Sequence, residues 1–221
     1  MTAMRHAYDL IVFDWDGTLM DSTAHIVRSI QRACVQLGLP EPSREAASHV
    51  IGLGLIDAMR HIHPQLPDAT HQAMADAYRH QYVHQEETVE LFDGVLAGLA
   101  ALEDAGYLLA VATGKSRSGL NHALASTSLQ SRFVTTRTVD ECHSKPHPDM
   151  LLQICEQTGM QPARTLMVGD TSHDLLMARH AGTHGAGVSY GAHPLHVLQD
   201  CGPQAIFHSY HELQQWLMHG N

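Results

Sequence analysis

Several residues in this sequence have the types and spacing needed for chemistry on a charged ligand. Asp14 and Asp16 follow one short apolar run, and Asp170 and Asp174 follow another. Carboxylate oxygens are the ligands that Mg²⁺ prefers, and aspartates also act as nucleophiles and as proton donors or acceptors. Lys145 adds a positive charge that could hold an anion. These residues suit metal-assisted chemistry on an anionic substrate.

Each of these features alone also has an ordinary structural interpretation. Asp16 stands before a glycine, which is a common turn signal, and Thr113 precedes a possible helix N-cap. Asp170 could favour the positive end of a helix, and Lys145 could be solvated. Because the features follow successive apolar runs or precede the next helix, their joint occurrence by chance is improbable.

The elements that must position these residues alternate between strands and helices. Apolar runs predict parallel strands over Tyr8–Asp14, Tyr107–Thr113, Arg164–Asp170 and His184–Ser189. Helical patterns cover Val95–Ala105, Ser116–Ser126, Asp149–Thr158 and Ser172–Ala181, and shorter elements at Ala205–Phe207 and Tyr210–Met218 close the fold. This alternation predicts an α/β fold, with a Rossmann-like parallel sheet core and helices on both faces. Ligands bind at the carboxyl ends of the strands in such sheets, where the aspartates stand.

One interval, from Leu19 to Phe92, breaks the alternation. It is more than 70 residues long, which exceeds a normal crossover connection, and prolines divide it into helical segments. The helices are predicted over Ser22–Leu37, Arg44–Val50, Leu55–His61 and Thr70–Gln85. We therefore predict an all-helical cap of residues 20–90, inserted after the first strand of a catalytic α/β core formed by residues 1–19 and 91–221.

The charge balance disfavours some partners and constrains the site. The formal net charge is −10, from 13 basic and 23 acidic residues, and this disfavours nucleic-acid binding. The same charge repels a phosphorylated substrate, so cations within the site must reverse the local field. The chain contains only two lysines, Lys115 and Lys145.

Composition also bears on location. No apolar run approaches the roughly 20 residues needed to span a bilayer, and Met1–His6 does not resemble a secretion signal. The four cysteines are scattered without a CxxC pair, which suits a reducing compartment. We expect a cytoplasmic protein without a membrane partner.

His80 and His84 have spacing that could hold a metal, but without a third ligand nearby we favour a solvated helix face.

The motifs resemble those of the haloacid dehalogenase-like hydrolase superfamily. The matching segments are DWDGTLMDS at 14–22, ATGKS at 112–116, SKPHPDM at 144–150 and VGDTSHD at 168–174. The resemblance spans essentially the whole chain, and the helical insertion stands at the family's cap position. Within the superfamily, the sequence is most similar to phosphoglycolate phosphatase-like enzymes.

This resemblance implies an Mg²⁺-dependent phosphatase that acts through an aspartyl phosphate. Asp14 would attack phosphorus, and Asp16 would protonate the leaving group and then activate water. Mg²⁺ would be held by Asp14, the backbone carbonyl of Asp16 and Asp170, and Asp174 would orient a metal-bound water.

The remaining predicted site residues would contact the substrate. Thr113 and the amide of Gly114 would bind phosphoryl oxygens, and Lys145 would supply a fixed positive charge. Gly52 and Leu53 lie in a cap loop that either faces the cleft or forms a tight turn between helices. Candidate anion contacts in the cap, which could equally be solvated, are Arg28, Arg32, Arg44 and Arg60. The resemblance favours a small phosphorylated substrate, with 2-phosphoglycolate as the first choice; sugar phosphates and nucleoside monophosphates remain open.

Other activities of related proteins fit less well. Dehalogenases of the superfamily lack the second aspartate of the first motif, here Asp16, and phosphonate-cleaving members need a cap lysine that residues 20–90 lack. Gly114-Lys115-Ser116 is not a P-loop, because Leu109 replaces the required glycine. A β-phosphoglucomutase-type mutase is the main alternative, although such enzymes usually carry an acidic residue where this chain has Gly169. A non-catalytic receiver-like phosphoacceptor is a further alternative, but receiver domains are shorter and lack the cap.

Overall fold

The computed structural model describes residues 7–84 and 89–219, so Met1–His6 and the predicted helix end at Gln85 lie outside the described residues. Within these ranges, six strands form one parallel sheet in the order β3-β2-β1-β4-β5-β6. The strands are β1 Leu10–Phe13, β2 Leu108–Thr113, β3 Thr135–Thr138, β4 Thr165–Gly169, β5 His184–Val188 and β6 Ala205–Phe207. The order reverses between β1 and β4, which is the point where sheets of this kind bind ligands.

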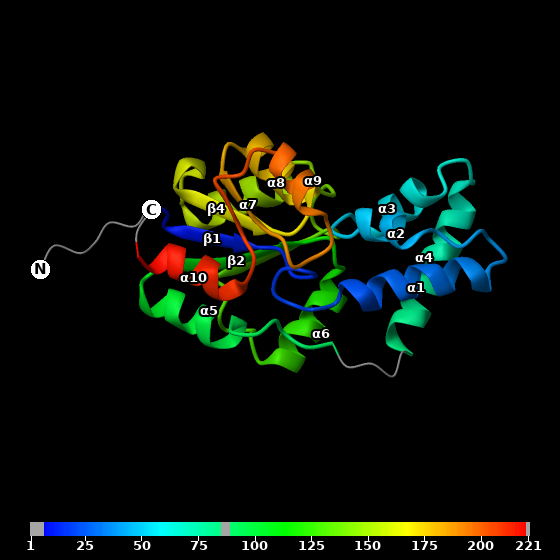
Figure 1. Cartoon of the computed structure of the whole chain (residues 1–221), viewed down its shortest axis with the longest axis horizontal. Coiled ribbons are helices and arrows are strands. Elements are labelled where there is room, and N and C mark those ends of the chain that lie inside the picture. The colour runs from blue at the N-terminus through cyan, green and yellow to red at the C-terminus, as the bar shows by residue number, and fades with distance from the viewer. Residues whose placement is uncertain (1–6, 85–88, 220–221) are drawn as a thin grey trace, which may run out of the picture.

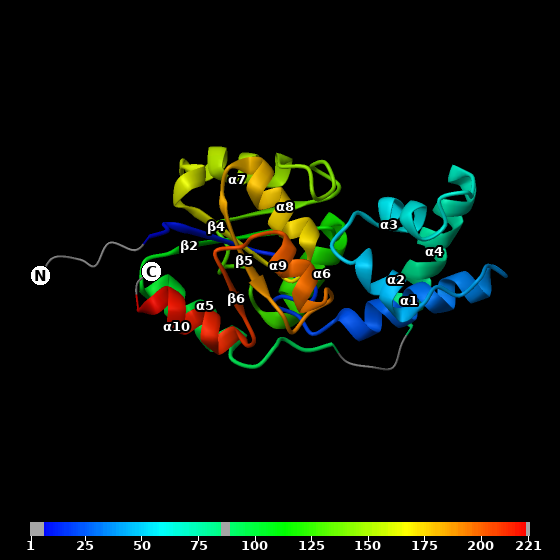
Figure 2. The same cartoon turned by 45° about the horizontal axis from the view of Figure 1, so that its top comes forward.

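Helices cover both faces of the sheet, as Figures 1 and 2 show. One face carries α5 (Val95–Asp104), α6 (Arg117–Thr127) and α10 (Tyr210–Met218), and the other carries α7 (Asp149–Thr158) and α8 (Ser172–Ala181). A short 3-10 helix, Pro162–Arg164, precedes β4, and α9 (Leu195–Asp200) packs against α8.

The central strand β1 is buried on both faces, which explains its unbroken apolar sequence. Ile11 and Phe13 pack into the cluster formed with α5, α6 and α10. Leu10 and Val12 point to the opposite face, into the cluster formed with α7 and α8. Alternate residues of a strand point to opposite faces, so an apolar run is what a fully covered parallel strand requires.

A separate helical unit follows β1 in the chain. It contains α1 (Thr23–Gln36), α2 (Arg44–His49), α3 (Leu55–Ile62) and α4 (Asp68–Val83). These helices enclose their own apolar cluster, in which α1 packs along α4. Figure 1 shows the unit at one end of the sheet. We call it the cap; its exact division from the core, at residues 20–90, stays a prediction.

The predicted fold class is confirmed, but three elements were missed: the short 3-10 helix, β3 and α9. No strand was predicted at β3, because its residues Thr135–Thr138 (TTRT) are polar and form an edge strand that pairs with only one neighbour. The helix α9 is too short for a clear helical period. The first strand is also shorter than predicted: Tyr8 precedes it and Asp14 follows it.

Candidate active site

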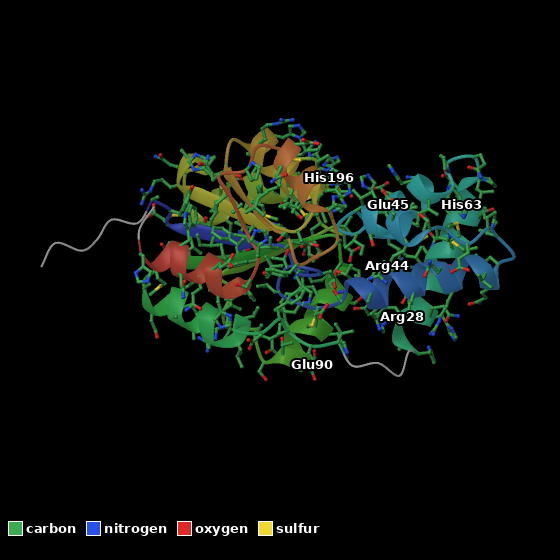
Figure 3. All side chains as sticks on the ribbon, viewed as in Figure 1. Arg28, Arg44, Glu45, His63, Glu90 and His196 are labelled. Atoms are coloured by element: carbon green, nitrogen blue, oxygen red, sulfur yellow. The ribbon has the colours of Figure 1, made fainter. Side chains whose placement is uncertain are left out.

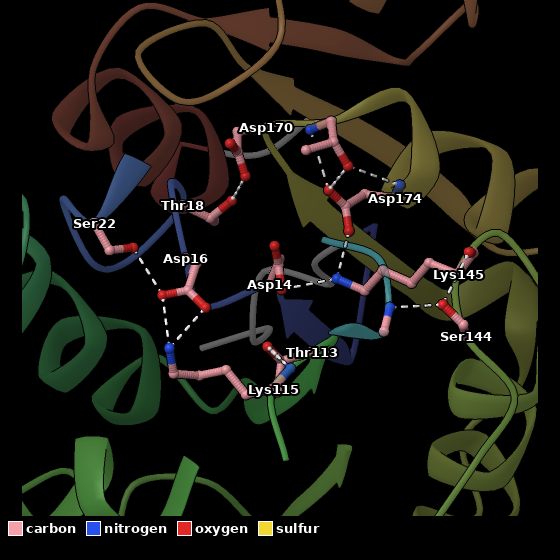
Figure 4. Close-up of polar contacts among 12 residues, drawn as sticks. Asp14, Asp16, Thr18, Ser22, Thr113, Lys115, Ser144, Lys145, Asp170 and Asp174 are labelled. Carbon is pink, nitrogen blue, oxygen red and sulfur yellow. Dashed lines mark hydrogen bonds and ion pairs between the residues drawn. The ribbon is translucent and has the colours of Figure 1, made fainter. Parts of the chain in front are cut away.

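The site lies at the carboxyl ends of three neighbouring strands. Asp14 directly follows β1, Asp170 directly follows β4, and Thr113 ends β2. Because β1 is hydrogen-bonded to both β2 and β4, these three residues are brought to the same edge of the sheet (Figure 4). Asp174 joins them from the first turn of α8, where it forms a capping box with Thr171.

Lys145 bridges two of the aspartates. Its Nζ lies 2.7 Å from Oδ1 of Asp14 and 2.7 Å from Oδ1 of Asp174, and all three side chains are fully enclosed. Burial acts to lower the pKa of Lys145, but the attraction of the two carboxylates outweighs it and raises the pKa above its ordinary value. Lys145 is therefore a fixed cation in the site.

One lysine does not balance the negative charge around it. Burial, opposed by Lys145 and reinforced by Asp174, raises the pKa of Asp14 to about 7. Burial and the charges of Asp14 and Asp174 also raise the pKa of Asp170 well above its usual range. Asp170 is held in place by the Thr18 hydroxyl, which donates at 2.8 Å. Burial is thus the main cause of both raised pKa values, and repulsion between the neighbouring carboxylates adds to it.

These carboxylates fit a hard divalent cation. Asp14, Asp170 and Asp174 each offer an oxygen, and the three oxygens lie within 4.8 Å of one another. The Oδ2 atom of Asp14 is buried and has no hydrogen-bond partner among the described residues. A buried carboxylate oxygen without a donor is costly, and a cation would satisfy it.

The carboxylate of Asp16 points away from this group. Lys115 Nζ lies 2.9 Å from each of its oxygens, and the Ser22 hydroxyl donates to Oδ1 at 2.7 Å. Lys115 also approaches the cap, where its Nζ lies 3.4 Å from the hydroxyl of Tyr82 in α4. The pair of aspartates in the first motif is thus divided between two separate lysines (Figure 4).

The sequence did not predict a role for Lys115. Two signals were available: its place in the ATGKS segment and the presence of only one other lysine in the chain. Neither signal identifies Asp16 as its partner, which stands 99 residues earlier in the chain. Ser22 and Thr18 were likewise inside the first motif without an assigned role.

The second motif lies directly beneath a cap loop. A Cβ atom at Gly114 would be 2.5 Å from the carbonyl oxygens of both Gly52 and Leu53. The loop is fixed by the backbone N–H of Gly54, which donates to the Ser144 hydroxyl at 2.8 Å, and Gly52 itself has a φ of +93°. Gly52 and Leu53 therefore border the site, and their contact with substrate stays a prediction.

The cap arginines differ in their surroundings. Arg60 pairs with Asp57 and Asp68 on the exposed surface. Arg28 and Arg32 line an open groove between α1 and α4, and Figure 3 shows Arg28 on α1 and Arg44 at the start of α2. None of these described contacts involves Asp14, Asp170 or Asp174.

The two histidines with possible metal spacing stack on one another. The rings of His80 and His84 lie 4.2 Å apart. Within the described ranges they join no third metal-ligating side chain.

No helix in the described part of the chain is both long and apolar enough to cross a membrane.

A parallel sheet that carries buried aspartates and a lysine at its point of reversal, under a helical cap, is the architecture of a cap-bearing hydrolase. The family model described as haloacid dehalogenase-like hydrolase matches residues 11–188, and the chain belongs to this family.

Curated relatives support the same class. The chain is 38% identical over 210 residues to "Probable phosphatase IndB" of Dickeya dadantii, which covers 92% of this chain and 91% of the relative. It is 33% identical over 182 residues to "Pyrophosphatase PpaX" of Anoxybacillus flavithermus, covering 81% and 83%. It is 28% identical over 220 residues to "Phosphoglycolate phosphatase" of Mannheimia succiniciproducens, covering 95% and 98%.

Solved structures share the fold over the same extent. A crystal structure from Haemophilus somnus, described as a predicted phosphoglycolate phosphatase, aligns with a TM-score of 0.85 at 25% identity, covering 96% of this chain and 98% of that one. A hydrolase from Pseudomonas syringae aligns with a TM-score of 0.86 at 21% identity, covering 93% and 96%. The predicted family and enzyme class are confirmed: the chain is a phosphatase of the haloacid dehalogenase-like family.

Proposed function

We propose that this phosphatase hydrolyses small phosphate esters or anhydrides, depends on Mg²⁺, and forms a phosphorylated intermediate on Asp14. The observation that carries the proposal is the buried group in which Asp14 meets Lys145, Asp170 and Asp174 while its own Oδ2 has no partner among the described residues. Asp14, Asp170 and the backbone carbonyl of Asp16 would hold the ion, with Asp174 as a further ligand or the partner of a bound water. When bound, Mg²⁺ would neutralise charge on the phosphoryl oxygens.

In the first step, a carboxylate oxygen of Asp14 attacks phosphorus in line with the leaving oxygen. The new bond from Asp14 to phosphorus forms as the bond to the leaving group breaks, and the leaving oxygen keeps the electron pair. Asp16 donates a proton to that oxygen. Lys145 keeps its charge beside Asp14, while the Thr113 hydroxyl and the Gly114 amide bind phosphoryl oxygens.

In the second step, Asp16 accepts a proton from a water molecule. The water oxygen attacks phosphorus, the bond between phosphorus and Asp14 breaks, and Asp14 recovers its carboxylate. Inorganic phosphate leaves, and Asp16 carries the proton needed for the next first step. The separate position of the Asp16 carboxylate, outside the group of three aspartates, supports this role in proton transfer.

The same geometry favours hydrolysis over the mutase alternative. A Cβ atom at Gly169 would overlap Cβ and Cγ of Asp174, so this position accepts no side chain while Asp174 stays in place. The acidic residue that mutases usually carry before the fourth-motif aspartate would therefore displace Asp174. A receiver-like role without turnover is disfavoured because a cap loop borders the site.

The cap limits the size of the substrate. The carbonyls of Gly52 and Leu53 lie directly against the second motif, and this close approach of the cap supports a small substrate rather than a polymer or a protein. Relatives carry names that specify pyrophosphate or phosphoglycolate. We propose that the substrate belongs to this small class, with 2-phosphoglycolate as the leading candidate, and that the enzyme works in the cytoplasm.

The test is phosphate release from a panel of small esters and pyrophosphate, with and without Mg²⁺, by the wild type and by Asp14→Asn. The proposal expects Mg²⁺-dependent release that disappears in the variant, whose side chain is nearly the same size. Release by the variant at the wild-type rate, or release that is unaffected by a chelator, would contradict it.

A further inference from the structure

The second lysine of the chain is placed at the boundary between the core and the cap. Lys115 follows β2 in the core, and it contacts Tyr82 in α4 of the cap through both the hydroxyl, at 3.4 Å, and the ring face, whose centroid lies 5.1 Å from Nζ. Its main partner is the carboxylate of Asp16, which it contacts symmetrically at 2.9 Å from each oxygen. Neither step of the proposed mechanism uses this cation, although it lies beside the proposed proton donor.

The position of Lys115 relative to the reacting atoms follows from the position of Asp16. To pass a proton, Asp16 must lie within hydrogen-bonding distance of the leaving oxygen. Lys115 Nζ contacts both oxygens of Asp16, so a substituent one or two bonds beyond the leaving oxygen comes within reach of this ammonium group. Lys115 is thus placed on the leaving-group side of the site.

Lys145, in contrast, is on the phosphoryl side and cannot serve the leaving group. Its side chain is 0% exposed and is enclosed by Asp14 and Asp174. The side chain of Lys115 is 14% exposed, and that of Asp16 is 11% exposed. An incoming anion can therefore reach Lys115 and replace Asp16 as its partner, and no buried charge is left unpaired if Asp16 takes up a proton in the exchange.

We propose that Lys115 selects substrates whose leaving group carries a negative charge close to the leaving oxygen, such as a carboxylate two bonds away or a second phosphate. This inference rests on the proposed function, because it assumes that Asp16 faces the leaving oxygen. The substrate anion takes the place of Asp16 as the partner of Lys115, and Asp16, no longer paired with a cation, takes up from solvent the proton that it donates to the leaving oxygen. A neutral leaving group of the same size offers no such exchange, and Lys115 stays on Asp16.

The proposal also accounts for the net charge of the protein. A chain with a formal charge of −10 repels a dianionic or trianionic substrate, and its two lysines are the compact cations that can offset this. Each lies against one aspartate of the first motif, one beside the phosphoryl group and one beside the leaving group. Tyr82 contacts the second lysine from the cap, so the proposed anion contact also links the core to the cap helix α4.

The experiment compares two esters of similar size, 2-phosphoglycolate and 2-hydroxyethyl phosphate. The second ester has a neutral hydroxymethyl group where the first has a carboxylate. The readout is the ratio of kcat/KM for the charged ester to kcat/KM for the neutral one. In the wild type this ratio favours the charged ester, and in Lys115→Met it falls about tenfold or more, since a hydrogen bond to a charged group is lost on one substrate only. Lys115→Arg, which keeps the cation, retains most of the ratio.

Two results would overturn the inference while leaving the proposed function intact. One is a wild-type ratio that does not favour the charged ester. The other is an equal loss on both esters in Lys115→Met, with the ratio preserved, which would make Lys115 a residue that only positions Asp16. Pyrophosphate and methyl phosphate provide a second pair with the same expected direction. Failure of the wild type to release phosphate from any of these compounds would instead contradict the proposed function itself, and thermal unfolding of both variants shows that they are folded.

Discussion

The two lysines of the chain define two regions of one site that are built differently. Lys145 lies among core residues alone, is fully enclosed and holds two aspartates at 2.7 Å. Lys115 lies where the core meets the cap, is partly exposed and shares its contacts between Asp16 and Tyr82. The contacts of the first lysine are all with core aspartates, whereas the second lysine also contacts a cap helix.

This difference separates the chemistry from its selectivity. The phosphoryl group is common to every substrate of a phosphatase, so the residues that handle it can be fixed and buried. The leaving group varies between substrates, and in our proposal its contacts lie at the junction with the inserted helices, where sequence change does not disturb the sheet. Changes in the first region should therefore affect all substrates alike, and changes in the second should affect them unequally.

The largest effect is expected from Lys145→Met. It removes the lysine beside Asp14 and with it one of the cations that would stabilise the charge of the phosphoryl group, so kcat/KM falls by about 10²–10³-fold, the size associated with loss of one charge-stabilising group. The fall is equal for 2-phosphoglycolate and 2-hydroxyethyl phosphate, in steady-state assays of phosphate release. Unequal losses of kcat/KM for the two esters would contradict the assignment of Lys145 to the phosphoryl group alone. Circular dichroism of the variant with Mg²⁺ confirms that it is folded.

A smaller effect is expected from Gly114→Ala, which perturbs the junction itself. The new methyl group would lie 2.5 Å from the carbonyl oxygens of Gly52 and Leu53, so the cap loop must move away from the second motif. Displacement of the loop by about 1 Å near the reacting groups lowers the rate of the chemical step by up to about 100-fold.

Gly119→Ala is the matched control for this prediction. Gly119 lies within α6, where the nearest contact of an added Cβ is the Ser116 hydroxyl at 3.2 Å. The control should retain activity and gain slightly in stability, because alanine favours a helix over glycine. Full activity of Gly114→Ala in the same assay would show that the cap loop does not need its observed position.

The smallest effect concerns the pH dependence of stability in the phosphoryl region. The pKa of Asp14 in the folded, metal-free protein is raised from 3.8 to about 7, chiefly by burial. Between these values the folded state binds more protons than the unfolded state, so the free energy of unfolding falls as pH rises through this window. The raised pKa of Asp170 acts in the same direction.

Mg²⁺ replaces these protons and removes the penalty. The increase in Tm on adding Mg²⁺ should therefore be larger near pH 8 than near pH 5, since protons compete with the metal at the lower pH. Differential scanning fluorimetry measures this, and Asp14→Asn should reduce the dependence on pH. An increase that is the same at both pH values would show that these carboxylates are not the metal site.

The sequence predicted the phosphoryl region better than the leaving-group region, for physical reasons. Asp14, Thr113 and Asp170 end or follow strands, and a parallel sheet brings strand ends together without further information. The contact of Lys115 with Asp16 depends on side-chain directions and on a cap helix, and neither leaves a pattern along the chain. The polar strand β3 was missed for a related reason, since its place is set by pairing with β2 rather than by its own residues.

The central claim is that the phosphoryl group is transferred to Asp14 before it is released as phosphate. Isolation of this phosphorylated intermediate tests the claim most directly. Asp16→Asn should block the second step, and p-nitrophenyl phosphate should still phosphorylate the enzyme because its leaving group needs no proton. After an acid quench, intact-protein mass spectrometry should show one added phosphoryl group, and borohydride reduction followed by peptide mapping should place it on Asp14. Phosphate release without any phosphorylated protein, or a phosphoryl group on another residue, would contradict the account.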